Sequence, residues 1–215
     1  MTRVCFLGDP DVTLKYELLS RETAREALAS YDLASPFENT VAVETISLGQ
    51  AVSLCNDLDW YVVRFVADVL VQEPSVHERE WLSRPLAEAV RNGDVDPAET
   101  GEYLKIYGLV DPATDDREAE ESPESPDVGE SSDAASTSSP SPDPATAIEE
   151  RPRDGPSARD EEGAGIENRD DAPREGLRLV EPLYTRRRGE EIPVYDLRPV
   201  EGTLVVRLTE REFGA

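Results

Sequence analysis

Histidine and cysteine are scarce in this sequence of 215 residues. The single histidine, His77, excludes zinc sites that need two or more, and two cysteines, Cys5 and Cys55, are too few for a disulfide framework. No run approaches the roughly 18 to 20 apolar residues of a membrane span. Asp9 and Pro10 lie where a secretory signal keeps its apolar region. We therefore expect a cytoplasmic protein with no membrane partner, no metal and no cofactor.

Positive charge is also scarce. The chain has 47 acidic residues against 22 basic ones, a formal net charge of -25, and only Lys15 and Lys105 among the bases are lysine. An arginine preference is typical of GC-rich coding, and abundant carboxylate is typical of proteins in a salt-filled cytosol. Together they indicate a haloarchaeal cytoplasm. At molar salt the Debye length is about 3 Å, so this charge serves hydration rather than long-range attraction.

A DNA mimic, or an acidic partner for a basic protein, is the alternative explanation of the charge. Such a mimic needs its carboxylates on a rigid surface, whereas residues 111–175 hold 21 of the acids together with 9 prolines, and neither leucine nor an aromatic residue. Ordering a residue costs about 1 to 2 kcal/mol, and burying an aliphatic side chain returns about 1.5 to 3 kcal/mol. The three large aliphatics of this stretch cannot offset that cost, so we predict a disordered acidic linker over residues 111–175.

The amino-terminal part, residues 1–110, shows mixed periodicity. Residues 4–7 and 40–46 read as buried strands. Residues 14–19 fit both strand alternation and helical spacing, and we favour a hairpin there. Ser20 is expected to cap a helix over residues 21–31.

From Ser47 onward the pattern is helical. Ser47 and Gln50 form a capping box, and the valine-rich residues 60–71 read as helix by periodicity and as strand by propensity. We favour helix, which would make Arg64 and Asp68 an ordinary i, i+4 surface pair.

Two further capping boxes predict helices. Residues 75–78 would open one that restarts at Pro85 and ends at Gly93, with His77 on its first turn. Residues 96–99 would open another that ends at Gly108.

After the linker, apolar residues return in alternation at residues 177–180, 183–184, 192–195 and 203–208. These predict strands, with a turn at residues 187–190. Forty residues are too few to fold alone, so residues 176–215 should complete the domain begun by residues 1–110. The predicted fold class is α+β, with a small mixed or antiparallel sheet built from both chain ends and covered by four or five helices.

Two places are candidate binding sites. Arg186, Arg187 and Arg188 form the only basic cluster, and with Tyr184 they could grip a phosphate, a nucleic-acid backbone or an acidic segment. A solvated turn, largely neutralised by Glu190 and Glu191, is the simpler interpretation.

Asp9 and Asp11 form the second candidate, because the loop after the first strand is where an open α/β sheet places phosphates or magnesium. The loop lacks the glycine spacing of a dinucleotide site and the lysine of a P-loop, so an ordinary turn is favoured. His77 has no partner that would make it catalytic. Cys5 and Cys55 fall on expected core positions.

Three segments carry a resemblance to a known family: residues 16–28 (YELLSRETAREAL), 47–58 (SLGQAVSLCNDL) and 181–188 (EPLYTRRR). They resemble an uncharacterised family of small acidic haloarchaeal proteins, a domain of unknown function. The resemblance implies a lineage and a cytosolic location, and it assigns no activity or site.

The function that we expect first is a non-enzymatic interaction or regulatory module, which meets another protein through the apolar helix near Trp60 or through the arginine turn. No set of nucleophile, base and orienting group can be assembled from the sequence. The second hypothesis is a small phosphate- or nucleotide-handling enzyme that uses Asp9, Asp11 and the arginines. The third, which the negative net charge disfavours, is nucleic-acid binding through the arginines.

Overall fold

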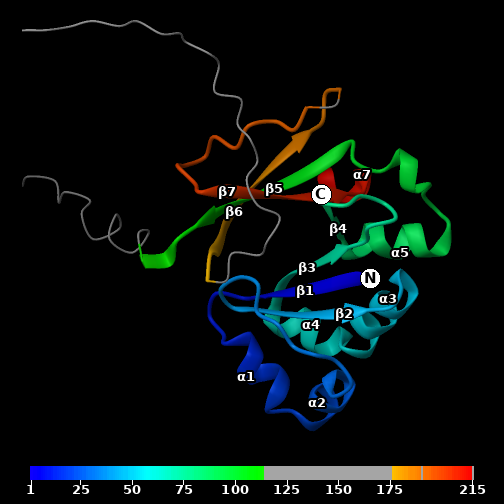
Figure 1. Cartoon of the computed structure of the whole chain (residues 1–215), viewed down its shortest axis with the longest axis vertical. Helices are drawn as coiled ribbons and strands as arrows, with labels where there is room; N and C mark the ends of the chain where they lie inside the picture. The colour runs from blue at the N-terminus through cyan, green and yellow to red at the C-terminus, as the bar shows by residue number, and fades with distance from the viewer. Residues whose placement is uncertain (114–175, 190, 215) are drawn as a thin grey trace, which may run out of the picture. The chain divides into compact units, whose positions relative to one another are not determined.

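The computed structural model describes residues 1–113, 176–189 and 191–214, which build a seven-stranded mixed sheet with helices against it (Figure 1). The strand order is β2-β1-β3-β4-β7-β5-β6, and all neighbours are antiparallel except the parallel pair β4 and β7. The predicted α+β class is confirmed. The elements are β1 (Thr2–Gly8), α1 (Leu14–Leu19), α2 (Glu22–Leu28), β2 (Thr40–Thr45), α3 (Leu48–Asp57), α4 (Asp59–Phe65), β3 (Val66–Gln72), β4 (Trp81–Ser83), α5 (Arg84–Asn92), the 3-10 turn η1 (Pro97–Glu99), β5 (Tyr103–Val110), β6 (Arg178–Arg186), β7 (Gly202–Leu208) and α7 (Glu210–Phe213).

Both ends of the chain contribute to this sheet, as predicted. β5 closes the amino-terminal part and lies between β7 and β6, which come from the carboxyl-terminal part. β7 also pairs with β4, so the carboxyl-terminal strands are hydrogen-bonded to the amino-terminal ones on two sides. The predicted linker over residues 111–175 lies outside the described residues, apart from residues 111–113.

The sheet bends strongly between its two halves. Asp68 on β3 and Lys105 on β5 are separated by two strands in the sheet order, yet Lys105 Nζ lies 2.5 Å from Asp68 Oδ2. A second contact joins the halves where the Glu38 main-chain N–H donates to the Leu177 carbonyl at 2.8 Å. Twist and β-bulges bend sheets, and register shifts lie at Gly8 in β1 and at Gly108 in β5.

The bend buries both faces of the central strands. One face of β1 places Val4 and Phe6 against α1 to α5, and the other places Cys5 against side chains of β7. A strand that is buried on both faces can be apolar without interruption, which explains the run at residues 4–7. Both cysteines are buried, as expected, and burial raises the pKa of each thiol to about 12.

The hairpin predicted over residues 14–19 is wrong, because this segment forms helix α1. Leu14 and Leu18, four residues apart, are both buried in the core, whereas Tyr16, which a strand would place on the same face as these leucines, is 69% exposed. The following helix α2 is shorter than predicted and has Arg21 at its N-cap, so Ser20 does not cap it.

The helix predicted through residues 47–71 is only partly right. Ser47 caps α3 as expected, accepting a hydrogen bond from the Gln50 main-chain N–H, and α4 ends at Phe65. The chain then becomes strand β3, whose alternate side chains enter the two cores. Arg64 and Asp68 are therefore not an i, i+4 pair on one helix. The extended conformation of β3 is stabilised by its pairing with β1 and β4, which the local periodicity of the sequence does not reveal.

The capping boxes at residues 75–78 and 96–99 open no α-helix. Ser75 Oγ instead donates to Glu73 Oε1 at 2.7 Å, and α5 begins only at Arg84, with Ser83 as its N-cap. Pro85 in its first turn and Gly93 after its last residue stand where the sequence predicted, and Gly93 has the positive φ of 78° that favours glycine.

The second box caps only the short 3-10 turn η1, and the predicted helix up to Gly108 is strand β5. A Cβ at Gly108 would lie 2.7 Å from Val200 and 2.9 Å from Val180. Gly108 therefore permits the close approach of Val180 on β6 and of Val200, which precedes β7, and it does not end a helix.

The carboxyl-terminal part follows the prediction in outline. β6 runs without a break from Arg178 to Arg186, so the two short strands predicted there are one. Residues 192–195 form no strand, although Tyr195 is buried against Leu104 and Ile106. The part also has a helix of its own, α7, which begins with a capping box between Thr209 and Glu212 and was not predicted. With α7 counted, the described residues hold six named α-helices, slightly more than the four or five expected.

Candidate functional site

The arginine turn lies at the end of β6, where the exposed Arg186 and the mostly buried Arg187 are both bound to acidic residues of the same chain. Arg186 forms a double hydrogen bond with Glu102. Arg187 donates to Glu80 Oε1 at 2.5 Å, and its main-chain N–H donates to the Glu102 carbonyl. The charge of two of the three arginines is therefore matched by carboxylates of this same chain.

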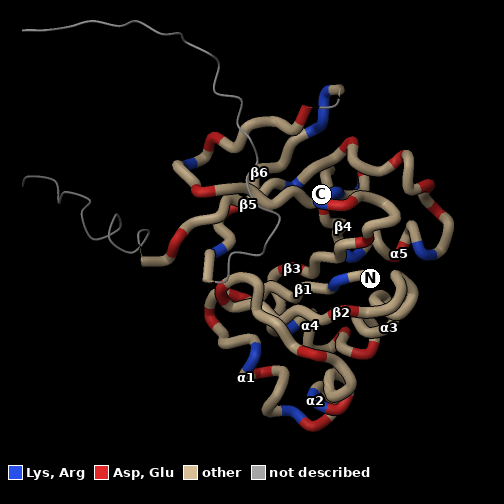
Figure 2. The backbone as a smooth tube through the Cα atoms, viewed as in Figure 1, with Lys and Arg blue, Asp and Glu red and all other residues tan. Residues whose placement is uncertain are grey.

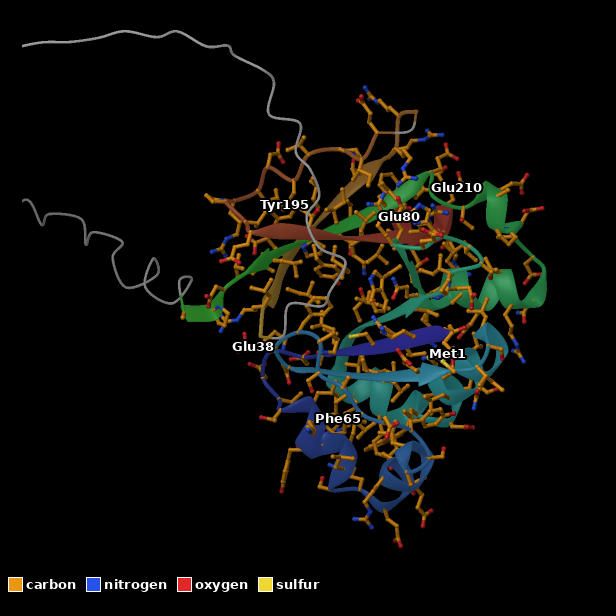
Figure 3. All side chains as sticks on the ribbon, viewed as in Figure 1. Met1, Glu38, Phe65, Glu80, Tyr195 and Glu210 are labelled. Atoms are coloured by element: carbon orange, nitrogen blue, oxygen red, sulfur yellow. The ribbon has the colours of Figure 1, made fainter. Side chains whose placement is uncertain are left out.

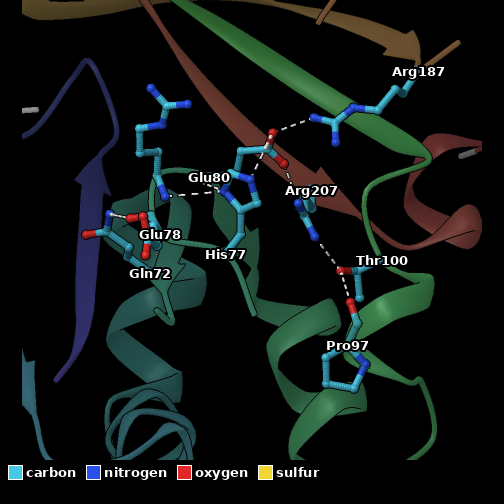
Figure 4. Close-up of polar contacts among 9 residues, drawn as sticks. Gln72, His77, Glu78, Glu80, Pro97, Thr100, Arg187 and Arg207 are labelled. Carbon is cyan, nitrogen blue, oxygen red and sulfur yellow. Dashed lines mark hydrogen bonds and ion pairs between the residues drawn. The ribbon is translucent and has the colours of Figure 1, made fainter. Parts of the chain in front are cut away.

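Glu80 is the centre of this cluster (Figure 4). It is 5% exposed, and its second oxygen accepts from Arg207 Nε at 2.5 Å. Arg207 also donates to Thr100 Oγ1 at 2.7 Å, which connects η1 to β7. We call Glu80, Arg187 and Arg207 the arginine clamp, because it joins the segment before β4 to both carboxyl-terminal strands.

Burial and hydrogen bonding oppose each other at Glu80. Burial alone would raise the pKa of this carboxyl, but hydrogen bonds from Arg207 and Arg187 outweigh it, so the pKa lies below its ordinary value. Glu80 is thus ionised near neutral pH. The Arg187 Nε atom is buried and has no hydrogen-bond partner among the described residues. The clamp is a tightly packed ion cluster in which the carboxylate is satisfied by two arginines.

His77 supports the turn that carries Glu80. The main-chain N–H groups of Arg79 and Glu80 donate to His77 Nδ1 at 3.2 and 2.9 Å, so this nitrogen carries no proton. His77 Nε2 lies 3.8 Å from Glu80 Oε1. Burial and the nearby arginines lower the pKa of His77, and Glu80 only partly opposes them. The neutral imidazole is therefore the form that holds the turn.

Asp9 and Asp11 form an ordinary polar turn after β1. Asp9 Oδ1 accepts from the Asp11 main-chain N–H at 3.2 Å, and the Asp9 N–H donates to the Phe65 carbonyl. Asn39, with a positive φ of 52°, holds the loop by donating to the Asp9 and Val12 carbonyls. Within the described ranges, no hydrogen bond or ion pair joins this loop to the arginine turn. Those ranges also hold no group of three or more metal-ligating side chains.

A second polar cluster lies inside the bend of the sheet and was not predicted. Lys105 Nζ and the Tyr107 hydroxyl both donate to Asp68 Oδ2, at 2.5 and 2.7 Å. Lys105 also lies 5.9 Å from the ring centre of Tyr184, the predicted binding residue, which is half exposed. Burial and the charge of Asp68 raise the pKa of Tyr107. Lys105 is one of only two lysines in an arginine-rich chain, and that was the one signal that could have marked this cluster.

Large apolar side chains are exposed on α1 and α4. Val63 is 80% exposed, Tyr16 69% and Trp60 57%, although the neighbouring Val62 and Phe65 are buried. Figure 3 labels Phe65, whose ring lies 6.0 Å from that of Trp60 in an edge-on arrangement.

Arg21 connects the two helices across this surface. Its guanidinium lies 5.7 Å from the ring centre of Trp60 on α4 and pairs with Glu17 on α1 at 3.2 Å. Two shallow hollows lie along α4 and α1. One is lined by Asp59, Trp60, Val63 and Arg64, and the other by Thr13, Lys15, Tyr16, Leu19 and Ser20. We call the exposed apolar residues, Tyr16, Trp60 and Val63, with these hollows, the α1–α4 surface.

Two of the three basic residues of the α1–α4 surface, Lys15 and Arg64, have no acidic partner among the described residues, whereas Arg21 is bound to Glu17. Asp59, which shares a hollow with Arg64, is bound to Arg84 at 2.8 Å. Figure 2 shows Lys and Arg residues among the acids on α1 and α2. Lys15 and Arg64 are thus exposed cations that share their hollows with the exposed rings of Tyr16 and Trp60.

Comparison with family models places the chain in a known family. Residues 2–109 match the family of unknown function DUF5804, and the chain belongs to it. The matched range ends within β5, so β6, β7 and the arginine turn lie outside it. No curated protein and no solved structure matches the chain. None of the helices in the described ranges has the length and apolar character needed to cross a membrane.

Proposed function

We propose that this chain is a cytosolic protein-interaction module of a halophilic archaeon, and that it binds a partner protein through the α1–α4 surface. The observation that carries the proposal is the exposure of Tyr16, Trp60 and Val63 on two adjacent helices. Contiguous exposed apolar side chains are a mark of interaction surfaces, and tryptophan and tyrosine supply much of the binding energy there.

The contacts of the arginine turn favour the α1–α4 surface over the turn itself as the binding site. Arg186 and Arg187, which the phosphate and nucleic-acid hypotheses need, are bound to Glu102 and Glu80. Releasing Arg187 would leave the buried Glu80 with one arginine fewer. A ligand would have to offset that loss before it gained any affinity.

The high salt concentration of the proposed halophilic cytosol also favours an apolar contact with the partner. At molar salt, attraction between exposed charges is screened within about 3 Å. The stabilisation that comes from burying apolar surface is not screened by salt, and strongly hydrated ions increase it. A protein of a salt-filled cytosol is therefore expected to bind chiefly through side chains such as Trp60.

A displayed library of random short peptides tests the proposal with the full chain as bait. We expect enriched peptides whose binding weakens at least tenfold on Trp60→Ala, the loss typical of a central aromatic side chain. Val194→Ser is the matched control, because Val194 is 77% exposed and lies on another segment. Far-UV circular dichroism checks that both variants are folded.

Two results would contradict the proposal. One is a library from which no peptide emerges that depends on Trp60. The other is equal weakening by Trp60→Ala and Val194→Ser, which would mean that binding does not involve the α1–α4 surface.

A further inference from the structure

The two hollows of the α1–α4 surface share one composition. Each combines an exposed aromatic ring with a basic side chain, Trp60 with Arg64 in one and Tyr16 with Lys15 in the other. Aromatic rings and aliphatic side-chain stems receive an apolar side chain, and an ammonium or guanidinium group beside them receives a carboxylate.

The cations are available for this role. Glu17 pairs with Arg21, and Asp59 pairs with Arg84, so the nearest acids on α1 and α4 are already engaged. Lys15 and Arg64 are exposed and form no ion pair with the residues that the structure describes. Arg21 is bound to Glu17 on α1 and lies near the rings of Trp60 and Phe65 on α4, so it links the two helices that carry the hollows.

We infer that the partner contributes an acidic segment, with a large apolar side chain for each hollow and carboxylates next to them for Lys15 and Arg64. The inference rests on the proposed function, since it names the chemistry of the partner at that same surface. A carboxylate in direct contact with Arg64 is desolvated by the neighbouring ring, so salt screens it less than it screens distant charges.

A basic segment fits this surface less well. It would place its own cations against Lys15, Arg21 and Arg64, and the carboxylates that could receive them are bound to Arg21 and Arg84. A second copy of this chain is a different occupant, and concentration-dependent self-association distinguishes it from an acidic partner.

The composition of the selected peptides is the first test. The same display selection with the full chain is expected to enrich aromatic or large aliphatic residues next to Asp or Glu. An enriched peptide is then synthesised, and its affinity is measured by fluorescence anisotropy for the wild type and for Lys15→Glu/Arg64→Glu. We expect the double reversal to weaken binding about tenfold, the size of one or two contact ion pairs.

A control variant and a charge swap separate contact from net charge. Arg91→Glu/Arg211→Glu reverses two exposed arginines at the ends of α5 and α7, and it should change the affinity less than about twofold. A peptide with Lys in place of its acids should bind Lys15→Glu/Arg64→Glu more tightly than it binds the wild type.

The outcomes distinguish the inference from the proposed function. Two outcomes would overturn the acidic partner and leave the interaction surface in place. In one, the Trp60-dependent peptides contain no acidic residues. In the other, they bind the wild type and Lys15→Glu/Arg64→Glu with equal affinity. The absence of any Trp60-dependent peptide would overturn both. Self-association that is lost on Trp60→Ala would show that a second copy occupies the surface, which also overturns the acidic segment.

Discussion

At the scale of single residues, His77 shows how tertiary contacts assign a role that the sequence left open. The sequence offered no partner for it, whereas the folded chain uses its Nδ1 atom to accept two main-chain hydrogen bonds. The charged groups that influence it are Glu80 and the arginines Arg79, Arg187 and Arg207. Their combined effect, with burial, favours the neutral ring.

Stability should therefore fall as the pH falls through the range where an exposed histidine takes up a proton. The pKa of His77 in the folded state lies below its ordinary value of 6.5, so the unfolded state binds the proton first. The stabilising contribution is complete above about pH 6.5 and is lost below it. Glu80, whose pKa is lowered, keeps its contribution until more acidic pH.

Urea unfolding at constant salt, followed from about pH 8 to about pH 5.5, measures this effect. We expect the free energy of unfolding to decline less for His77→Gln than for the wild type, because the chain has no other histidine. Parallel curves for the two proteins would show that His77 does not contribute to the decline.

At the scale of elements, the boundary between α4 and β3 was the hardest to predict. Residues 60–71 are apolar at nearly every position, so a helical and an extended pattern fit equally well. The change from helix to strand at Val66 follows from pairing with β1 and β4, which lie far away in the sequence. By contrast, Pro85 and Gly93 were predicted correctly, because their local backbone geometry determines their positions.

Replacing each of two glycines in these elements by alanine should change the free energy of unfolding in opposite directions. Gly108→Ala should lower the free energy of unfolding by about 1 to 3 kcal/mol, since its Cβ would lie within 3.0 Å of Val200, Val180 and Tyr195. Gly49→Ala, in α3, has its nearest neighbour at 3.8 Å and should raise it by up to about 1 kcal/mol. Urea unfolding measures both, and a loss of stability in both variants would mean that the close approach at Gly108 is not the cause.

At the scale of the whole molecule, the arginine clamp joins parts of the chain that are distant in sequence. Glu80 and Arg187 are 107 residues apart, and Glu80 and Arg207 are 127 residues apart. The sequence indicated a basic turn at Arg186, Arg187 and Arg188, but burial of Arg187 depends on where β4 places Glu80. The binding role predicted for this turn, with Tyr184, Asp9 and Asp11, stays a prediction.

Removal of the central charge tests the clamp. Glu80→Gln leaves the buried Arg207 and the mostly buried Arg187 without their counter-charge, and it should lower the free energy of unfolding by about 3 kcal/mol. Glu78→Gln, at an exposed position of the same segment, should change it by less than about 0.5 kcal/mol. Urea unfolding at one salt concentration compares them, and equal values would show that Glu80 is not the element that joins the two parts.

The sequence alone determined the α+β class, the participation of both chain ends in one sheet and the positions of the proline and glycine boundaries, because composition and local backbone geometry carry that information. Tertiary structure decided which apolar runs are strands, which arginines are buried and which aromatic side chains remain exposed. These depend on partners more than 30 residues away, such as Asp68 for Lys105, and no local pattern contains them. The apolar run around Trp60 was visible in the sequence, but only the folded chain separates buried Phe65 from exposed Trp60 and Val63.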